Sequence, residues 1–243
     1  MALIGRMGNE IINVIKTQKD IKIVCGFDKE QYKEGEFPIY NKIEDIQEKV
    51  DVIIDFSVPK ATFEILKYAK KNKTPTVIAT TGFNEKELNE IEEISKEIPI
   101  FKSSNMSLEI NLMANLVQKV AEILQESDIE IIETHHNKKI DSPSGTAILL
   151  ADAINKAFNG KKDYNFDRMS KRVKRDKNEI GFSSIRGGNI VGEHTVQFFG
   201  EKETLEITHK SYSRQVFAEG ALKAARFIIT QPKGLYDMKN LVK

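Results

Sequence analysis

Residues 50–83 read VDVIIDFSVPKATFEILKYAKKNKTPTVIATTGF, and this stretch decides the fold class of the chain. Apolar runs at 50–56 and 75–80 flank a segment in which apolar residues recur at helical spacing between 61 and 69. Two short apolar runs joined by a helical pattern are typical of a strand–helix–strand unit, whose two strands run parallel. The stretch therefore predicts an α/β fold built on a parallel sheet.

The same alternation continues on both sides of this unit, from the start of the chain to about residue 105. Further strands are predicted at 21–27 and 98–101, and the apolar spacing over 88–94 marks a further helix. Strands that alternate with helices favour a doubly wound, Rossmann-like sheet with helices on both faces. The first part of the chain is therefore expected to form one α/β domain.

The pattern changes after Asn105, where three strand-like runs follow one another without a helix between them. Strands in succession predict an antiparallel or mixed sheet, and so a second domain of α+β type. In the last run apolar and polar residues alternate, which predicts one apolar face. The elements expected are helices at 108–125, 144–158 and 216–229, and strands at 129–134, 179–185, 189–199 and 204–212. We assign 1–106 with 216–243 to the first domain and 107–215 to the second.

The composition of the 243 residues is that of a globular protein. The hydrophobic content of 40% excludes disorder, and 37 basic against 36 acidic residues give no reason to expect nucleic acid as a partner. The single cysteine, Cys25, lies in an apolar run and is expected to be a buried, inert thiol. No apolar run reaches the roughly 20 residues of a membrane span, and the start lacks a signal-peptide pattern. We expect a cytoplasmic protein with no membrane partner.

Residues 161–177 form a basic stretch, with eight Lys or Arg residues against three Asp. It lies between a predicted helix and the run of strands, where connections usually pass over the surface. A solvated loop is the simpler interpretation, and a contact to phosphate or to a partner is the alternative.

A dinucleotide site is suggested near the start of the chain. Gly5-Arg6-Met7-Gly8 opens a helical pattern, and Asp28 follows the next strand 20 residues after Gly8. Glycines let the backbone approach a pyrophosphate at a helix start, and an acid at that distance can accept hydrogen bonds from a ribose 2′-hydroxyl. Lys29 offers a cation for a 2′-phosphate, so either NADH or NADPH is expected. The alternative is that the two glycines only allow close packing of a helix on a strand.

One part of this dinucleotide pattern is missing. A parallel strand of about 5–6 residues should precede the glycines, and only residues 1–4 are present. The first glycine of the usual fingerprint is absent too, with Ala2 or Leu3 at its place. We therefore expect the natural protein to begin upstream of the residue numbered 1.

The densest cluster of reactive side chains is ETHHNKKIDSPSGT at residues 133–146, running from a strand end into a helix start. Ser142 is expected to cap that helix and Pro143 to lie in its first turn. The backbone amides near Gly145 and Thr146 would then form an anion site, suited to a carboxylate.

The two adjacent histidines of this run suit proton transfer better than metal binding. His135 and His136 would point to opposite sides of an extended segment, so no metal site is expected. A histidine exchanges a proton near neutral pH, and Lys139 can supply a second proton or hold an anion. The simpler alternative is two surface histidines in a polar loop.

The run His135-His136-x-x-Lys139-x-Asp141-x-Pro143-Ser144-Gly145-Thr146-Ala147 resembles the signature of the dihydrodipicolinate reductase family. The likeness covers nearly the whole chain. The other motifs, in the family's order, are Gly5-Arg6-Met7-Gly8, Asp55-Phe56-Ser57, Ala79-Thr80-Thr81-Gly82-Phe83, Ser104-Asn105-Met106-Ser107, Arg186-Gly187-Gly188 with Gly192-Glu193-His194, Ser213-Arg214 with Phe217-Ala218, and Gly234-Leu235-Tyr236-Asp237-Met238.

The resemblance implies an enzyme of lysine biosynthesis that reduces 4-hydroxy-tetrahydrodipicolinate to tetrahydrodipicolinate with NAD(P)H, in the diaminopimelate route. It implies a homotetramer with a nucleotide domain and a domain for substrate binding and oligomerisation. It makes His135 the general acid/base and Lys139 a proton donor, with His136, Gly145 and Thr146 on the dicarboxylate. The residues implied at the cofactor are Gly5, Arg6 and Met7 along the pyrophosphate, Asp28 and Lys29 at the adenosine ribose, and Ala79, Thr80, Thr81, Ser103, Ser104, Asn105 and Met106 near the nicotinamide.

The chain departs from the family pattern at Glu109, which stands where a glycine is expected after Asn105-Met106-Ser107. An acid beside a site for anions would repel them, so Glu109 is expected to point away. Two other functions are kept open. One is a different NAD(P)-dependent dehydrogenase of amino or hydroxy acids on the same two-domain plan, and the other is a non-catalytic dinucleotide-binding regulatory protein.

Overall fold

The computed structural model describes residues 5–29 and 36–242. The chain divides into two compact units, one of Met1–Leu108 with Arg214–Lys243 and one of Glu109–Ser213. The strand that the sequence predicts before Gly5 falls on residues 1–4, which lie outside the described residues. Within the described parts, no helix is long and apolar enough to cross a membrane.

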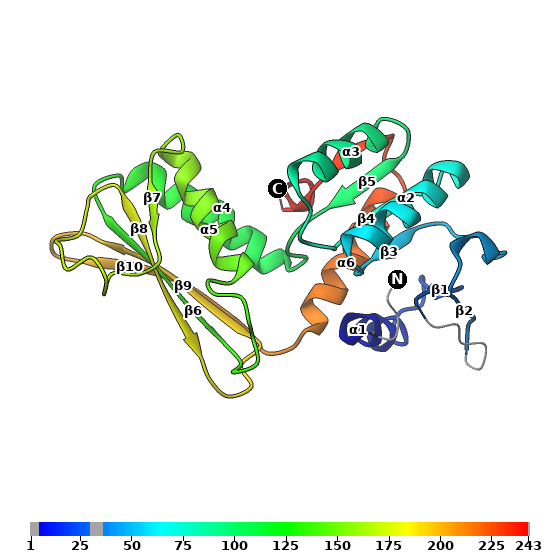
Figure 1. Cartoon of the computed structure of the whole chain (residues 1–243), viewed down its shortest axis with the longest axis horizontal. Coiled ribbons are helices and arrows are strands. Elements are labelled where there is room, and N and C mark those ends of the chain that lie inside the picture. Colours follow the sequence, from blue (N-terminus) through cyan, green and yellow to red (C-terminus); the bar gives the residue numbers. More distant parts are fainter. Residues whose placement is uncertain (1–4, 30–35, 243) are drawn as a thin grey trace. The chain divides into compact units, whose positions relative to one another are not determined.

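The first unit is built on a parallel sheet of four strands in the order β11-β5-β4-β3. A separate parallel pair is formed by β1 and β2. The elements of this unit (Figure 1) are α1 (Arg6–Ile15), β1 (Gly26–Phe27), β2 (Ile39–Tyr40), η1 (Ile43–Asp45), β3 (Ile53–Asp55), α2 (Pro59–Asn72), β4 (Thr76–Ile78), α3 (Glu85–Ser95), β5 (Pro99–Lys102), α6 (Gln215–Ile228), β11 (Gly234–Tyr236) and η2 (Met238–Asn240).

Alternate residues of the short strands supply a core on each face of this sheet. Val77 and Phe101 belong to the core that α1 and α6 complete. Their neighbours Ile78 and Ile100 belong to the core formed with α2 and α3. Because a sheet with apolar residues on both faces needs helices on both, the continuous apolar runs produce the doubly wound arrangement that the sequence predicts.

The strand predicted at 21–27 is mostly wrong, because only its last two residues form β1. Cys25 precedes β1 and is partly buried rather than fully buried. Burial, followed by the nearby charge of Glu48, raises the pKa of its thiol to about 11. The thiol is therefore protonated near neutral pH, which agrees with the expected low reactivity because the thiolate is the reactive form.

The second unit is a mixed sheet of five strands in the order β10-β9-β6-β8-β7. Its helices α4 and α5 pack on one face of the sheet (Figure 1). Strand β6 is central, parallel to β8 and antiparallel to β9. The elements are α4 (Leu108–Ile123), β6 (Asp128–His135), α5 (Gly145–Ala157), β7 (Asp163–Asn165), β8 (Glu179–Arg186), β9 (Gly192–Phe199) and β10 (Thr204–Ser211).

This sheet settles the choice between an antiparallel and a mixed arrangement. The connection from β6 to β8 contains α5, and a helical crossover returns the chain parallel to the strand it left. The antiparallel part consists of the β9–β10 hairpin and of the pairing of β9 with β6, which lies between β8 and β9 in the sheet. The predicted fold class, a Rossmann-like parallel sheet plus an α+β domain, is confirmed.

Three of the basic residues in 161–177 make ion pairs or hydrogen bonds instead of forming a wholly solvated loop, although Arg168 remains 45% exposed. Arg168 and Arg175 pair with carboxylates of β6 and β8, and Lys162 Nζ donates to the Lys177 carbonyl at 2.6 Å. The stretch also contains the short strand β7, which the sequence does not predict. The other five basic side chains are exposed: Lys161, Lys171, Arg172, Lys174 and Lys177.

Candidate active site

The strand ends of the first unit carry a hydrogen-bonded polar cluster. Asp55, the last residue of β3, is fully buried. Its carboxylate accepts hydrogen bonds from Thr62 Oγ1 at 2.6 Å, Thr80 Oγ1 at 3.0 Å and the Ser57 amide at 2.9 Å. Because these donors come from α2 and from the segment after β4, Asp55 fixes the position of Thr80 at the carboxyl end of the sheet.

The segment after β5 is also held tightly. Ser103 Oγ donates to the Asn105 carbonyl at 2.7 Å, and Asn105 Oδ1 accepts from the Ser107 amide at 2.9 Å. The Met106 carbonyl lies against α6, where a Cβ added at Gly220 would stand 1.7 Å from its oxygen. In parallel sheets, ligands bind beyond the carboxyl ends of strands, so Ala79–Thr81 and Ser103–Met106 lie at the edge expected of a binding site.

The start of α1 fits an anion. Gly5 is its N-cap, no side chain caps the helix, and its first turn contains no acidic residue. Free amides and the helix dipole favour a phosphate group at such a position. Asp28 directly follows β1, and its Oδ1 accepts from the Lys29 amide at 2.7 Å. The residues predicted for the cofactor are thus all at helix starts or strand ends of the first unit.

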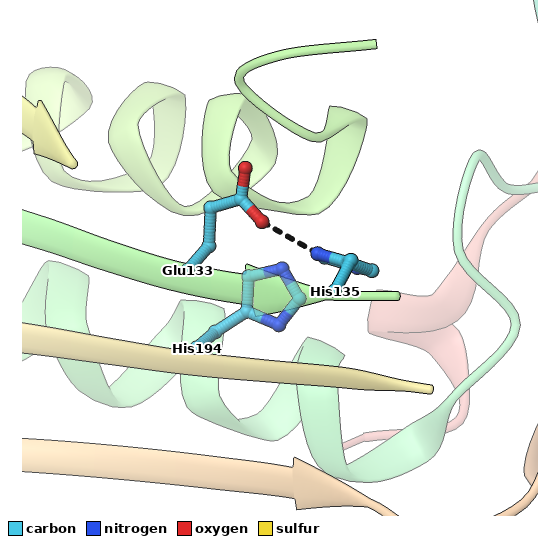
Figure 2. Close-up of side chains that lie close together, drawn as sticks. All are labelled: Glu133, His135 and His194. Carbon is cyan, nitrogen blue, oxygen red and sulfur yellow. Dashed lines mark hydrogen bonds and ion pairs between the residues drawn. The ribbon is translucent and has the colours of Figure 1, made fainter. Parts of the chain in front are cut away.

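The second unit places His135 in a buried polar cluster at the end of β6. Figure 2 shows Glu133 and His135 from β6 close to His194 from β9. Since side chains two apart on a strand share a face, Glu133 lies beside His135, and its Oε2 is 2.5 Å from His135 Nδ1. Glu133 is 1% exposed and His135 8%.

Arg186, the last residue of β8, donates two further hydrogen bonds to the carboxylate of Glu133. Its Nη2 donates to Oε1 at 2.7 Å and its Nη1 to Oε2 at 2.9 Å, and the Ser144 amide donates to Oε1 at 3.2 Å. Burial alone would raise the pKa of Glu133, but the hydrogen bonds from His135 and Arg186 hold it well below the usual range of a carboxyl group. Glu133 is therefore an ionised, fully hydrogen-bonded carboxylate.

His194 is a neutral neighbour of His135. The two rings meet edge to face with centroids 5.1 Å apart. Burial, followed by the charge of His135, lowers the pKa of His194 to about 3. Its Nε2 is 3.0 Å from Ser144 Oγ, and its Nδ1 has no hydrogen-bond partner among the described residues. If the proton of neutral His194 is on Nε2, it is donated to Ser144 Oγ, and no N–H group is buried without an acceptor.

The ligand atoms of Glu133, His135 and His194 lie within 4.8 Å of one another, close enough in principle to hold a metal ion. Arg186 opposes that use, because it donates to both oxygens of the carboxylate and places a positive charge beside them. Proton transfer suits this cluster better than a metal does.

The loop after β6 and the start of α5 complete the candidate site. The Ser142–Pro143 peptide is cis, and the N-cap of α5 is Ser144, whose Oγ accepts from the Ala147 amide at 3.1 Å. The predicted cap at Ser142 and helical Pro143 are therefore wrong. A Cβ added at Gly145 would meet no atom within 4 Å, so the start of α5 is open to a ligand.

Lys139 and His136 lie in the same loop. Lys139 Nζ pairs with Asp141 Oδ1 at 2.8 Å, and the His136 amide donates to the Ile190 carbonyl at 2.8 Å. The charge of Lys139 also contributes to the lowered pKa of His194, after the larger effects of burial and His135. The predicted substrate residues thus come from the end of β6, the following loop and the start of α5.

Comparisons with known proteins place the chain in a family. Family models described as dihydrodipicolinate reductase, N-terminus and C-terminus, match residues 3–106 and 109–242. The chain belongs to the dihydrodipicolinate reductase family.

Curated relatives cover almost the whole length of this family member. It is 48% identical to a 4-hydroxy-tetrahydrodipicolinate reductase of Caldanaerobacter subterraneus subsp. tengcongensis, over 98% of this chain and 95% of the relative. It is also 48% identical to a 4-hydroxy-tetrahydrodipicolinate reductase of Clostridium tetani, over 96% of this chain and 92% of the relative.

A solved dihydrodipicolinate reductase has the same fold. The dipicolinate-bound enzyme from Paenisporosarcina sp. TG-14 superimposes with a TM-score of 0.81, over 98% of this chain and 96% of that chain. Its sequence identity is 24%, so this likeness supports the fold alone.

Several residues that the structure brings to the site had no predicted role. Glu133, Arg186 and His194 surround His135, although the last two occur in the motifs quoted for the family resemblance. The alternation along β6 is a signal for Glu133, since it puts residues 133 and 135 on one face. Arg186 and His194 had no such signal, because their approach depends on which strands pair with β6.

Glu109, the departure from the family pattern, is an exposed residue in the first turn of α4. Burial lowers the pKa of His209 in β10, and the negative charge of Glu109 partly opposes that shift. Glu109 is thus electrostatically close to β10.

Proposed function

We propose that this chain reduces 4-hydroxy-tetrahydrodipicolinate to tetrahydrodipicolinate with NAD(P)H, in the diaminopimelate route to lysine. The observation that carries the proposal is the buried pair of Glu133 and His135 beside the open start of α5. The pair occurs in a chain that is 48% identical, over 98% of its length, to a curated reductase of that name.

The substrate is assigned to residues 107–215. The backbone at Gly145 and Thr146 begins α5, whose first turn has no acidic residue, so the helix dipole favours a carboxylate there. His136 and Lys139 add polar groups from the adjoining loop, and Lys139 carries a positive charge that suits a dianion. Dipicolinate, bound in the Paenisporosarcina enzyme, is a dicarboxylate of this class.

The nicotinamide cofactor is assigned to residues 1–106 and 216–243. Gly5, Arg6 and Met7 would hold the pyrophosphate at the uncapped start of α1. Asp28 and Lys29 would bind the adenosine ribose, and Asp28 suits a 2′-hydroxyl whereas Lys29 suits a 2′-phosphate, so we propose that both NADH and NADPH are used. Ala79–Thr81 and Ser103–Met106, at the ends of β4 and β5, would lie near the nicotinamide, which supplies the hydride when bound.

The protein's own chemical task is to move a proton. Reduction of the imine-conjugated ring, formed after water is lost, leaves an enamine that must gain a proton at the neighbouring carbon. His135 is assigned as the general acid that delivers it, and Lys139 as a further donor. Positioned proton transfer of this kind typically contributes about 10²–10⁴ in rate.

We also propose that the chain is a cytoplasmic homotetramer that assembles through the second unit. Apolar side chains remain exposed on its sheet, including Ile185 of β8 and Leu205 of β10. The predicted apolar face of β10 is only partly buried within one chain, since Ile207 packs against the core but Leu205 is 42% exposed. Exposed apolar surface of this kind is typical of subunit contacts. A sedimentation mass equal to one 27.6-kDa chain would overturn this assignment.

The direct test is oxidation of NADH and NADPH in an assay where dihydrodipicolinate synthase supplies fresh substrate. The proposal predicts turnover with both coenzymes, and inhibition by pyridine-2,6-dicarboxylate as a planar substrate-like dianion. Binding of either coenzyme without turnover would favour the non-catalytic alternative. Turnover with an amino or hydroxy acid, and none in the coupled assay, would favour the other dehydrogenase.

A further inference from the structure

The hydrogen bonds of Glu133 determine which nitrogen of His135 carries a proton. An ionised carboxylate only accepts hydrogen bonds. Oε1 accepts from Arg186 and Ser144, Oε2 accepts from Arg186 and His135, and the Ser184 side chain also hydrogen-bonds to the carboxylate. His135 Nδ1 must therefore be the donor in its 2.5 Å contact with Oε2.

The absence of a side chain at Gly192 leaves space beside the other nitrogen of His135. Gly192 lies across from the end of β6, and a Cβ added there would stand 3.0 Å from His135 Nε2. Any larger residue at this position would cover Nε2. The glutamate on one side and the glycine on the other thus give the two ring nitrogens different surroundings.

We propose that Glu133 is a positioning residue that holds a proton on Nδ1 of His135, so that Nε2 is the nitrogen that exchanges a proton with the substrate. In the neutral imidazole Nε2 carries the lone pair, and in the imidazolium it carries the proton to be delivered. Arg186 keeps the carboxylate in place with two parallel hydrogen bonds, a geometry that fixes orientation as well as distance. The catalytic part of this inference rests on the proposed function.

A substitution by glutamine separates this role from a merely structural one. In Glu133→Gln the side-chain carbonyl is expected at the Oε1 position, because an NH₂ group there would face two fixed donors, Arg186 Nη2 and the Ser144 amide. At the Oε2 position the NH₂ group faces only one fixed donor, Arg186 Nη1. The amide NH₂ group then faces His135 Nδ1, which must become an acceptor. The proton of neutral His135 consequently moves to Nε2.

The first readout is the tautomer of His135, followed by ¹H–¹⁵N correlation spectra in which His135→Gln assigns its signals. The chain has four histidines, so these spectra are simple. We expect Nδ1–H in the unsubstituted protein and a shift to Nε2–H in Glu133→Gln. An Nε2–H tautomer in the unsubstituted protein overturns the proposal even if the variant fails to fold.

The second readout is steady-state kinetics in the coupled assay. Glu133→Gln is expected to lower kcat by about 10²–10⁴, the range of positioned acid–base catalysis, with the KM of the coenzyme unchanged. Glu130→Gln is the matched control, because Glu130 lies on the same strand and pairs with Arg175 and Arg168 without contacting a histidine. It should leave kcat and the His135 tautomer unchanged.

The two readouts distinguish failure of this inference from failure of the proposed function. The tautomer is measured without substrate, so it tests the arrangement of Glu133 and His135 even in a protein that shows no turnover. An active protein in which Glu133→Gln keeps both the Nδ1–H tautomer and the full kcat would overturn the positioning role alone.

Discussion

Hydrogen-bond partners give two buried histidines of this protein, His135 and His194, different chemical properties at the scale of single residues. His135 is hydrogen-bonded to an ionised carboxylate, whereas His194, 4% exposed, contacts the hydroxyl of Ser144, has no carboxylate hydrogen-bonded to it among the described residues, and is neutral near pH 7. Transfer of a charge from water into such surroundings is costly. The same side chain can thus serve as a proton donor at position 135 and as a neutral packing partner at position 194.

The lowered pKa of His194 predicts a dependence of stability on pH. Its pKa is about 3 in the folded chain against an ordinary value of 6.5, so below pH 6.5 the unfolded chain binds a proton that the folded chain does not. The free energy of unfolding therefore decreases as the pH falls, and His194 contributes up to about 1.4 kcal/mol to this decrease for each pH unit. Urea unfolding at pH 7, 6 and 5 measures the slope.

His194→Gln should flatten that slope while leaving a contact to Ser144 available. The remaining slope is expected from His209, whose pKa burial also lowers, and near pH 5 from Glu133, whose pKa is lowered as well. A slope in His194→Gln as steep as in the unsubstituted protein would show that His194 is not the residue that titrates.

The reactive residues of the candidate site could be predicted from sequence, but their supporting contacts could not. The run from His135 to Thr146 stands out because its residue types are dense and contiguous. Arg186 is 53 residues from Glu133 in the chain, and His194 is 50 residues from Ser144. Such approaches depend on strand pairing, which a local pattern does not contain.

At the scale of elements, close packing of α6 on the segment after β5 fixes part of the cofactor edge. Gly220 in α6 faces the Met106 carbonyl, and both residues belong to the first unit. An alanine here would ordinarily favour a helix by about 1 kcal/mol. The packing requirement opposes that preference, because a Cβ would overlap the carbonyl oxygen.

Gly220→Ala is therefore expected to destabilise the first unit, by about 1–3 kcal/mol as for other overpacked positions. Glu219→Ala, at the exposed neighbouring position of the same helix, is the control and should be nearly neutral. Urea midpoints of the two variants make the comparison. Equal or greater stability of Gly220→Ala would contradict the close approach of Met106 to α6.

The elements that the sequence predicts well are those with enough residues to show a period. Helix α2 and strand β6 span 14 and 8 residues, and both are expected from the apolar spacing. Strands β2, β7 and β11 span only two or three residues, too few to establish alternation. Pairing with neighbours, and not local pattern, makes these short segments into strands.

At the scale of the whole molecule, the two patterns of alternation in the sequence correspond to the two units. Strands separated by helices form the parallel sheet of the first unit, and the last two of the three successive strands, β9 and β10, pair antiparallel in the second. The parallel pairing of β6 with β8 depends on the crossover through α5, and the sequence alone allowed either arrangement. Function follows from the sites on these units and from the family, since the fold alone is compatible with many reactions.

The central claim is that this family member is a reductase in which His135 delivers the proton. Turnover of His135→Gln beside the unsubstituted protein, in the coupled assay with dihydrodipicolinate synthase, tests it most directly. We expect the variant to fold and to bind NADH and NADPH as before, since His135 belongs to the second unit and the residues proposed for the cofactor belong to the first. We also expect kcat to fall by about 10²–10⁴. A variant with undiminished turnover would contradict the account.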